Sequence, residues 1–295
     1  MEKAAFEEKS YEGPLNTQLL FNNHIYWPPG QVFEEHFGID SALNAQNPNF
    51  WLLFGLSSPM NGVIVDDFNW GYIWRRIDSK KQLPTFNLNL FVQAKRPEYL
   101  YGRNNQYARN GIKGSYYRFE VMEHQQKALE RLATKLGNKA LIVYACPVFH
   151  SNNDLFRHIH NHSLVENSTF VRATNMKNHK RWVFDEPGTI GLACSEIERI
   201  KDEPFSVIIQ NMLNETLQLD SIPEIALKNL IHIESIIVKE FSDLRDRNEI
   251  AEEFFRRDSL LRDQFERAFN EPKLRSYIRI ISMTVLLNLN WYVFG

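Results

Sequence analysis

Two short segments of the chain carry side chains that are suited to metal-assisted hydrolysis. In the first, Glu34 and Glu35 precede a glycine turn that leads to Asp40. In the second, Gln93 and Lys95 are two residues apart, which places a carboxamide and an ammonium on one face of a strand. Mg²⁺ prefers oxygen ligands, and it can both activate a water and neutralise charge that builds on a phosphate. The two segments together predict a metal site for phosphodiester chemistry.

Each of these groups has a distinct expected role. Asp40 supplies a carboxylate oxygen to the ion, Gln93 supplies a neutral carbonyl oxygen, and the backbone carbonyl of Ala94 is a natural further ligand. Lys95 orients the attacking water or stabilises the developing charge. A desolvated lysine near a metal can also have a lowered pKa and act as the base.

The elements that must position these groups follow an α/β or α+β pattern around one sheet. Residues 88–95 alternate apolar and polar side chains and predict a strand, which Pro97 closes. Residues 121–136 repeat apolar side chains at helical spacing and end at Gly137. Residues 140–146 form a continuous apolar run, which is typical of a buried central strand.

The character of the sequence changes after about residue 200. Helical periodicity recurs in four segments, 205–219, 222–241, 249–269 and 273–289. We therefore expect a first domain over residues 1–200 and a helical C-terminal region over residues 201–295. Residues 1–30 are interpreted as a lead-in that ends at a Pro-Pro-Gly turn.

An acid-turn-acid segment followed by a strand with Gln-x-Lys resembles the PD-(D/E)xK, or restriction-endonuclease-like, nuclease superfamily. More narrowly it resembles the Mrr-like branch, in which Gln replaces the second acid of the strand motif. The resemblance covers roughly residues 31–146 and implies an α-β-β-β-α-β core. It carries the catalytic roles over to Asp40, Gln93, Lys95 and either Glu34 or Glu35 as the helix-borne acid.

The identity of the metal-binding carboxylate has two interpretations. Asp66 and Asp67 lie closer to Gln93 along the chain than Asp40 does. We favour Asp40, because a Gly-x-Asp that follows a helix end is a typical setting in the family. The Asp66–Asp67 pair is the alternative.

The resemblance implies a metal-dependent endonuclease that hydrolyses DNA with Mg²⁺ or Mn²⁺ as cofactor, in restriction or anti-phage defence. The alternative is a catalytically silent protein of the same fold that binds nucleic acid or a partner protein. A third interpretation is a purely structural α/β protein in which the Gln-x-Lys is a coincidence. Since two-strand cleavage commonly needs two sites, a homodimer or a defence-complex partner is attractive.

The composition and net charge of the chain indicate how it could bind an anionic substrate. Hydrophobic residues make up 43% of the chain and charged residues 24%, as in soluble globular proteins. The formal net charge of −2 gives no overall attraction to nucleic acid, so a local patch or a metal must provide it. Arg96, Arg103 and Lys113 are the predicted DNA contacts.

The termini, the cysteines and the histidines bear on localisation and on other kinds of site. The acidic N-terminus lacks an apolar core, and the longest apolar stretch near the C-terminus covers only residues 280–289, so we expect a cytoplasmic protein without membrane contact. Two cysteines cannot form a disulfide framework. The alternating His158, His160 and His162 would share a face on a strand, but no Cys or paired carboxylate completes a metal set, so we interpret them as a polar surface hairpin or loop.

Overall fold

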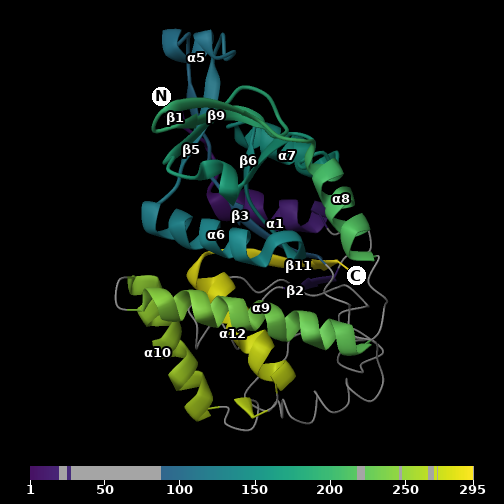
Figure 1. The fold of residues 1–295 in the computed structure, drawn as a ribbon. Coiled ribbons are helices and arrows are strands. Elements are labelled where there is room, and N and C mark those ends of the chain that lie inside the picture. Colours follow the sequence, from purple (N-terminus) through teal and green to yellow (C-terminus); the bar gives the residue numbers. More distant parts are fainter. Residues whose placement is uncertain are drawn as a thin grey trace. The chain divides into compact units, whose positions relative to one another are not determined.

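The computed structural model describes residues 1–19, 25–27, 88–217, 223–245, 248–264, 269–270 and 272–294. Within these ranges the chain is mixed α/β, with eight α-helices and with strands that form two sheets (Figure 1). The chain divides into two compact units. Unit 1 contains Met1–Tyr26 and Leu88–Gln218, and unit 2 contains Trp27–Asn87 and Leu219–Gly295.

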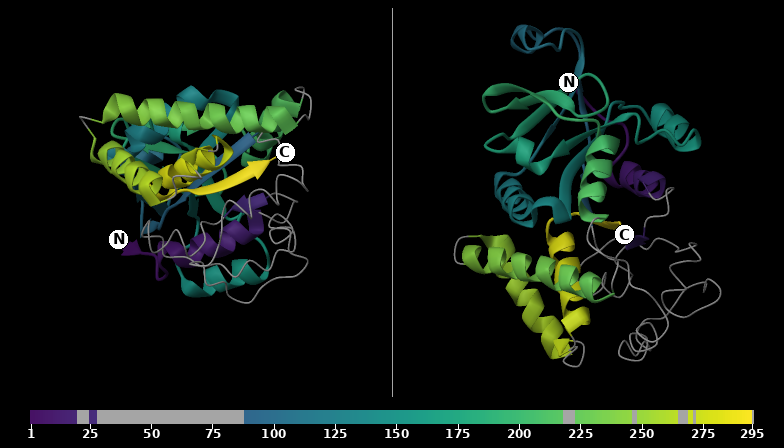
Figure 2. Two further views of the ribbon diagram at one scale, coloured as in Figure 1. Left: turned by 90° about the horizontal axis from the view of Figure 1, so that it is seen from below. Right: turned by 45° about the vertical axis from the view of Figure 1, so that its right-hand side comes forward.

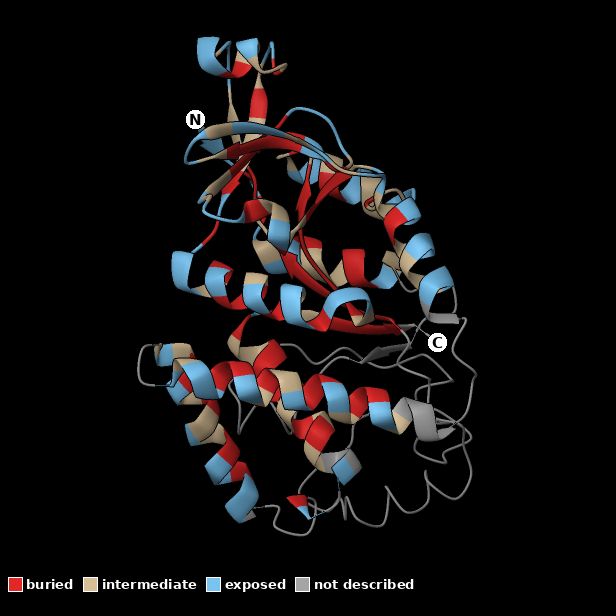
Figure 3. Ribbon diagram, viewed as in Figure 1, coloured by how far each residue is buried: buried red, intermediate tan, exposed pale blue. Residues whose placement is uncertain are grey.

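Two buried strands lie at the centre of unit 1. β3 (Leu88–Ala94) runs parallel to β6 (Ala140–Pro147), and β6 pairs on its other side with antiparallel β7 (Ser168–Arg172). Every residue of β3 and β6 is buried, as Figure 3 shows in red. β3 was predicted from its alternating apolar and polar side chains and β6 from its continuous apolar run, and both strands are confirmed.

Helix α6 (Glu123–Leu136) connects the β3 side of the chain to β6, and it confirms the predicted helix. Its buried face consists of Gln126, Ala128, Leu129, Leu132 and Leu136. Gly137 ends the helix with a φ of +53°, a conformation that glycine adopts without a Cβ penalty. A 3-10 turn, η2 (Gly137–Lys139), then leads directly into β6.

The N-terminal segment belongs to unit 1, so its interpretation as a lead-in is wrong. It forms β1 (Glu2–Lys3) and helix α1 (Glu8–Leu19). Tyr11 and Leu15 lie four residues apart on one face of α1, and both side chains are fully buried. The Tyr11 hydroxyl donates a hydrogen bond of 2.7 Å to Ser168 Oγ on β7. The burial of this face fixes the helix against the core, which its weak amphipathic pattern did not predict.

A second sheet, six-stranded and antiparallel, has the order β1-β4-β5-β8-β9-β10. The expectation of one sheet is therefore wrong, because β3, β6 and β7 belong to a separate sheet. The further strands of the six-stranded sheet are β4 (Glu98–Leu100), β5 (Tyr116–Glu120), β8 (Arg181–Phe184), β9 (Ile190–Cys194) and β10 (Ile197–Lys201). Helix α5 (Asn105–Arg109) lies between β4 and β5. The remaining elements of this part of the chain are β2 (Ile25–Trp27), α7 (Asn152–His160), η3 (Ala173–Met176) and α8 (Phe205–Leu217).

The described part of unit 2 is mainly helical. It contains α9 (Pro223–Leu244), α10 (Glu249–Gln264), α12 (Pro272–Leu286) and a final strand β11 (Asn290–Phe294). Together with α8 of unit 1, these helices confirm the helical periodicity that was found after residue 200. The helices α9 and α12 pack against each other (Figure 2). None of the described helices is long and apolar enough to cross a membrane.

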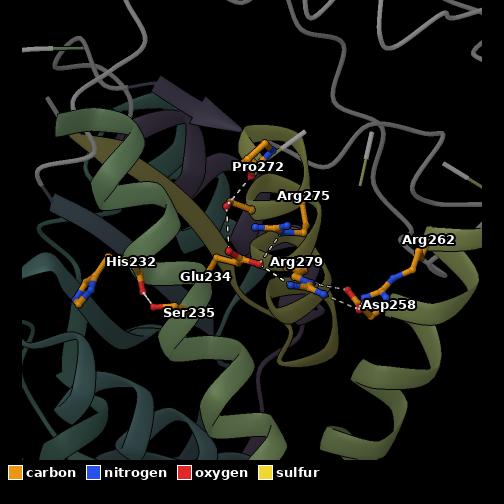
Figure 4. Close-up of polar contacts among 9 residues, drawn as sticks. His232, Glu234, Ser235, Asp258, Arg262, Pro272, Arg275 and Arg279 are labelled. Carbon is orange, nitrogen blue, oxygen red and sulfur yellow. Dashed lines mark hydrogen bonds and ion pairs between the residues drawn. The ribbon is translucent and has the colours of Figure 1, made fainter. Parts of the chain in front are cut away.

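A buried charge cluster joins α9, α10 and α12, the helices in the described part of unit 2 (Figure 4). The Arg279 guanidinium of α12 donates to both carboxylate oxygens of Asp258 on α10, at 2.7 and 2.9 Å, and to Glu234 Oε1 on α9 at 2.6 Å. The exposed fractions of these side chains are only 13% for Arg279, 7% for Asp258 and 6% for Glu234. Such a network fixes the mutual positions of the helices that carry it, because each charge depends on its partner.

Candidate active site

The Gln-x-Lys segment lies at the C-terminal end of β3, as predicted. Gln93 is 1% exposed, and it is the register partner of Tyr144 in the parallel pairing of β3 with β6. Lys95 follows the last strand residue, and its backbone N–H donates a 2.8 Å hydrogen bond to the carbonyl of Ala145. Because this bond continues the ladder, Gln93 and Lys95 keep the two-residue alternation that places them on one face.

The aromatic ring of Tyr144 lies beneath the Lys95 ammonium. Lys95 Nζ is 5.6 Å from the ring centroid, within the range of a cation–π interaction. The Tyr144 hydroxyl donates a 2.6 Å hydrogen bond to Gln126 Oε1 on α6. Gln126 Nε2 in turn donates to the carbonyl of Ala173 at 2.7 Å. The surface under Lys95 is thus fixed by a buried chain of hydrogen bonds that begins on a helix.

The electrostatic environment of Lys95 favours its neutral form more than water does. Burial lowers the pKa of Lys95 from the ordinary lysine value, because desolvation disfavours the ammonium. The charges of Glu8 and Cys146 act in the opposite direction and are smaller effects. Burial and Glu8 raise the pKa of the Cys146 thiol well above its usual range, so this cysteine is a neutral core thiol beside the lysine. Burial thus makes the Lys95 ammonium easier to deprotonate than that of an exposed lysine.

Glu8 is the acid that the structure adds to the candidate site. It begins helix α1, and it precedes the buried Tyr11 by three residues and Leu15 by seven, so all three lie on the same face of the helix. Its carboxylate interacts electrostatically with both Lys95 and Cys146. Glu8 and Lys95 are far apart in the sequence, and only the packing of α1 against β3 brings them together. No local spacing could have signalled this pair.

Five of the predicted acids cannot be placed. Glu34, Glu35 and Asp40, and the alternative pair Asp66 and Asp67, lie outside the residues that the structure describes. The choice between Asp40 and the Asp66–Asp67 pair therefore stays a prediction. The structure describes Gln93, Ala94 and Lys95 of the strand motif.

The described part of the candidate site offers oxygen ligand types that Mg²⁺ accepts. They are the carboxamide of Gln93, the backbone carbonyl of Ala94 and the carboxylate of Glu8. In the described ranges, no group of three or more His, Cys, Asp or Glu side chains is arranged to hold a metal.

The three predicted DNA contacts have different surroundings. Arg96 forms an ion pair with Glu7 at 3.0 Å and donates to the carbonyl of Ala4 at 3.1 Å, so it ties the N-terminal segment to the end of β3. Arg103 and Lys113 are exposed, and they lie on the connection between β4 and β5. Among these cations, Arg103 and Lys113 are the ones whose side chains face solvent.

The alternating histidines do not lie on a strand or hairpin. His158 and His160 belong to helix α7, where a spacing of two residues points side chains to nearly opposite sides. The His158 ring is instead hydrogen-bonded through Nδ1 to Ser163 Oγ at 2.8 Å. Ser151 begins this helix by accepting from the backbone N–H of Asp154, a cap that the sequence analysis did not use.

Comparison of the chain with protein-family models, with curated proteins and with solved structures gave no match.

Proposed function

We propose that this chain is a metal-dependent endonuclease that hydrolyses phosphodiester bonds in DNA, with Lys95 as its catalytic base. The observation that carries the proposal is the setting of Lys95. It ends a fully buried strand, shares a face with Gln93, has a lowered pKa and interacts with a helix-borne carboxylate, Glu8. Surface lysines at strand ends rarely combine these features, since solvent normally stabilises their ammonium.

The order of elements supports the same reading. After β3, the chain forms β4, α5 and β5, and it then reaches helix α6 and β6, which lies parallel to β3. A helix and a strand also follow the motif strand in the core that the resemblance implies. A role in restriction or anti-phage defence is part of the proposal on the resemblance alone.

The proposed cofactor is Mg²⁺ or Mn²⁺. We assign its protein ligands to Gln93, the backbone carbonyl of Ala94 and the carboxylate of Asp40, or of Asp66 or Asp67. Glu8 takes the place of the helix-borne acid, beside the roles that the resemblance gave to Glu34 and Glu35. When bound, the ion would neutralise charge on the phosphate and lower the pKa of a coordinated water.

Lys95 then performs the proton transfer. In its neutral form, the amine accepts a proton from the attacking water while the water oxygen bonds to phosphorus. The bond between phosphorus and the leaving ester oxygen breaks, and that oxygen takes a proton from solvent. The Tyr144 ring holds the amine in place and stabilises the ammonium that forms. Glu8 stabilises the same product charge.

Incubation of the purified protein with supercoiled plasmid tests the proposal. We expect nicked or linear DNA with Mg²⁺ or Mn²⁺ and intact plasmid with EDTA. Intact plasmid under every metal condition, with a gel shift on the same DNA, would instead favour the silent nucleic-acid-binding alternative and overturn the proposed activity.

A further inference from the structure

A row of aromatic side chains crosses three neighbouring strands on one face of the six-stranded sheet. Phe184, Tyr117 and Tyr99 are successive partners on β8, β5 and β4. The ring centroids are 5.8 Å apart for Tyr117 and Phe184 and 5.0 Å apart for Tyr99 and Tyr117. Tyr101 continues the row, 4.6 Å from Tyr99, and its exposed fraction of 66% leaves ring surface open to solvent. Burial thus decreases along the row toward Tyr101.

The row is held rigidly beneath its exposed end. The ring of His150 stacks on Tyr99 with centroids 4.3 Å apart and an interplanar angle of 8°. The Tyr101 hydroxyl donates a 2.6 Å hydrogen bond to Glu2 Oε2, and its ring meets the Tyr99 ring at an interplanar angle of 77°, so two contacts hold the ring in place. A ring that is already held in place loses little conformational entropy when it stacks on a ligand.

The connection that begins at Tyr101 is strongly basic. Residues 101–115 contain Arg103, Arg109 and Lys113 but no Asp or Glu, although the whole chain has a net charge of −2. All three cations are exposed. We call residues 101–115 the basic arm, and Figure 1 shows its helix α5 projecting from the rest of unit 1. The arm therefore offers a local positive potential where the protein as a whole offers none.

The basic arm has a fixed conformation. Asn104 caps helix α5 by accepting from the N–H groups of Gln106 and Tyr107, at 2.9 and 3.3 Å. Tyr107 and Ile112 are buried against Val183 and Leu192 of the sheet. Arg103, Arg109 and Lys113 are thus carried by a segment that packs against the sheet.

The exposed Tyr101 lies near the candidate catalytic lysine along the chain. It is six residues beyond Lys95, a span of at most about 21 Å for an extended chain. At a rise of about 3.4 Å per nucleotide of a strand, this distance corresponds to about six nucleotides. One bound strand can therefore contact both places.

We propose that the basic arm and Tyr101 form a binding site for single-stranded DNA, which delivers the strand to the site of the proposed endonuclease and so rests on that function. An unpaired base stacks on the Tyr101 ring, and Arg103, Arg109 and Lys113 bind the phosphates that follow. Aromatic rings flanked by cations bind single strands without sequence preference, because every base has a stacking face. In a duplex those faces are occupied by neighbouring bases, so the geometry favours a single strand.

Fluorescence anisotropy with a labelled oligothymidylate in EDTA tests this site, because it measures binding without cleavage. Tyr101→Ala should weaken binding by roughly five- to 150-fold, the loss of one base–aromatic stack. Tyr101→Phe keeps the ring and should bind as the unaltered protein does. Neutralising the three cations together should reduce the slope of log affinity against log salt by about 0.7 for each lost phosphate contact.

Lys135→Ala is the matched control, because it also removes one exposed cation. Lys135 is in the last turn of α6, which leads into the start of β6, whereas Lys95 and the basic arm follow the end of the parallel strand β3. It should leave binding and salt dependence unchanged. Affinity that is equal for the oligothymidylate and its duplex, or unaffected by Tyr101→Ala and by the triple neutralisation, would overturn the inference. Plasmid cleavage is scored separately, so loss of the proposed activity and loss of this binding site give different results.

Discussion

The ammonium of Lys95 lies 5.6 Å from the centre of the Tyr144 ring, and the hydroxyl of the same tyrosine is bound 2.6 Å from Gln126 Oε1. The face of the Tyr144 ring thus lies against Lys95, the candidate base, and the Tyr144 hydroxyl binds the buried Gln126 of α6. This makes Tyr144 a positioning residue whose two functions can be separated by substitution.

Tyr144→Phe keeps the ring and deletes the hydroxyl. We expect cleavage to continue, with a loss of about 1–3 kcal/mol in the free energy of unfolding because the Gln126 oxygen loses its buried donor. Tyr144→Leu removes the ring as well, so it should reduce the cleavage rate and lower the pKa of Lys95 further. Urea unfolding and the pH dependence of single-turnover cleavage measure the two effects, and equal pH profiles for both variants would contradict this role.

Glu8→Gln tests the electrostatic contact between α1 and the end of β3. The Glu8 carboxylate raises the pKa of Lys95, against the larger lowering by burial, so its removal should lower that pKa. A base acts in its neutral form, so the cleavage rate should rise with pH through the pKa of Lys95, and the variant should reach its plateau at lower pH. Glu7→Gln is the control, because Glu7 pairs with Arg96 instead. Identical profiles for Glu8→Gln and Glu7→Gln would count against the contact.

The lowered pKa of Lys95 also makes the free energy of unfolding depend on pH. The folded-state pKa of Lys95 lies below its ordinary value of 10.5, so the unfolded chain binds more protons between the two values. Its contribution to stability therefore increases as pH rises through that window. Lys95→Met should remove this part of the pH dependence, and the difference in urea midpoint between the two proteins should shrink toward alkaline pH.

Sequence patterns predicted the centre of unit 1 well and its periphery poorly. The strands β3 and β6 and the helix α6 each carry a complete local signal, in apolar alternation, a continuous apolar run and a glycine stop. Helix α1 carries no such signal, because its buried residues are only Tyr11, Leu15 and the polar Asn16. The Tyr11 hydroxyl is buried with a partner, Ser168, that β7 supplies. The electrostatic interaction of Glu8 with Lys95 depends on the packing of this helix, so no local sequence pattern indicates it.

Gly191→Ala tests the packing of the six-stranded sheet. A Cβ at this position would lie 2.4 Å from atoms of the Trp182 ring, which is fully buried. We expect a loss of about 1–3 kcal/mol in the free energy of unfolding, the usual cost of overpacking. Gly114→Ala meets nothing within 4 Å and serves as the matched control in thermal or urea unfolding. Equal stability of the two variants would show that the sheet does not pack as described.

Asp258→Asn tests the charge cluster of unit 2. Removing this carboxylate leaves the Arg279 guanidinium buried with only part of its compensation, for an expected loss of about 3–5 kcal/mol in urea unfolding. Glu253→Gln removes a more exposed pair on the same helix, where the loss should stay below about 1 kcal/mol. Comparable losses for both would indicate that the cluster does not join the helices.

The most direct test of the account is cleavage of supercoiled plasmid by Lys95→Ala in Mg²⁺, beside the unaltered protein and Lys135→Ala. The account predicts that Lys95→Ala stays folded and loses cleavage, because the amine is required only in the proton transfer. It also predicts that Lys135→Ala cleaves at the normal rate. A folded Lys95→Ala protein that cleaves as fast as the unaltered chain would contradict the assignment of Lys95 as the catalytic base.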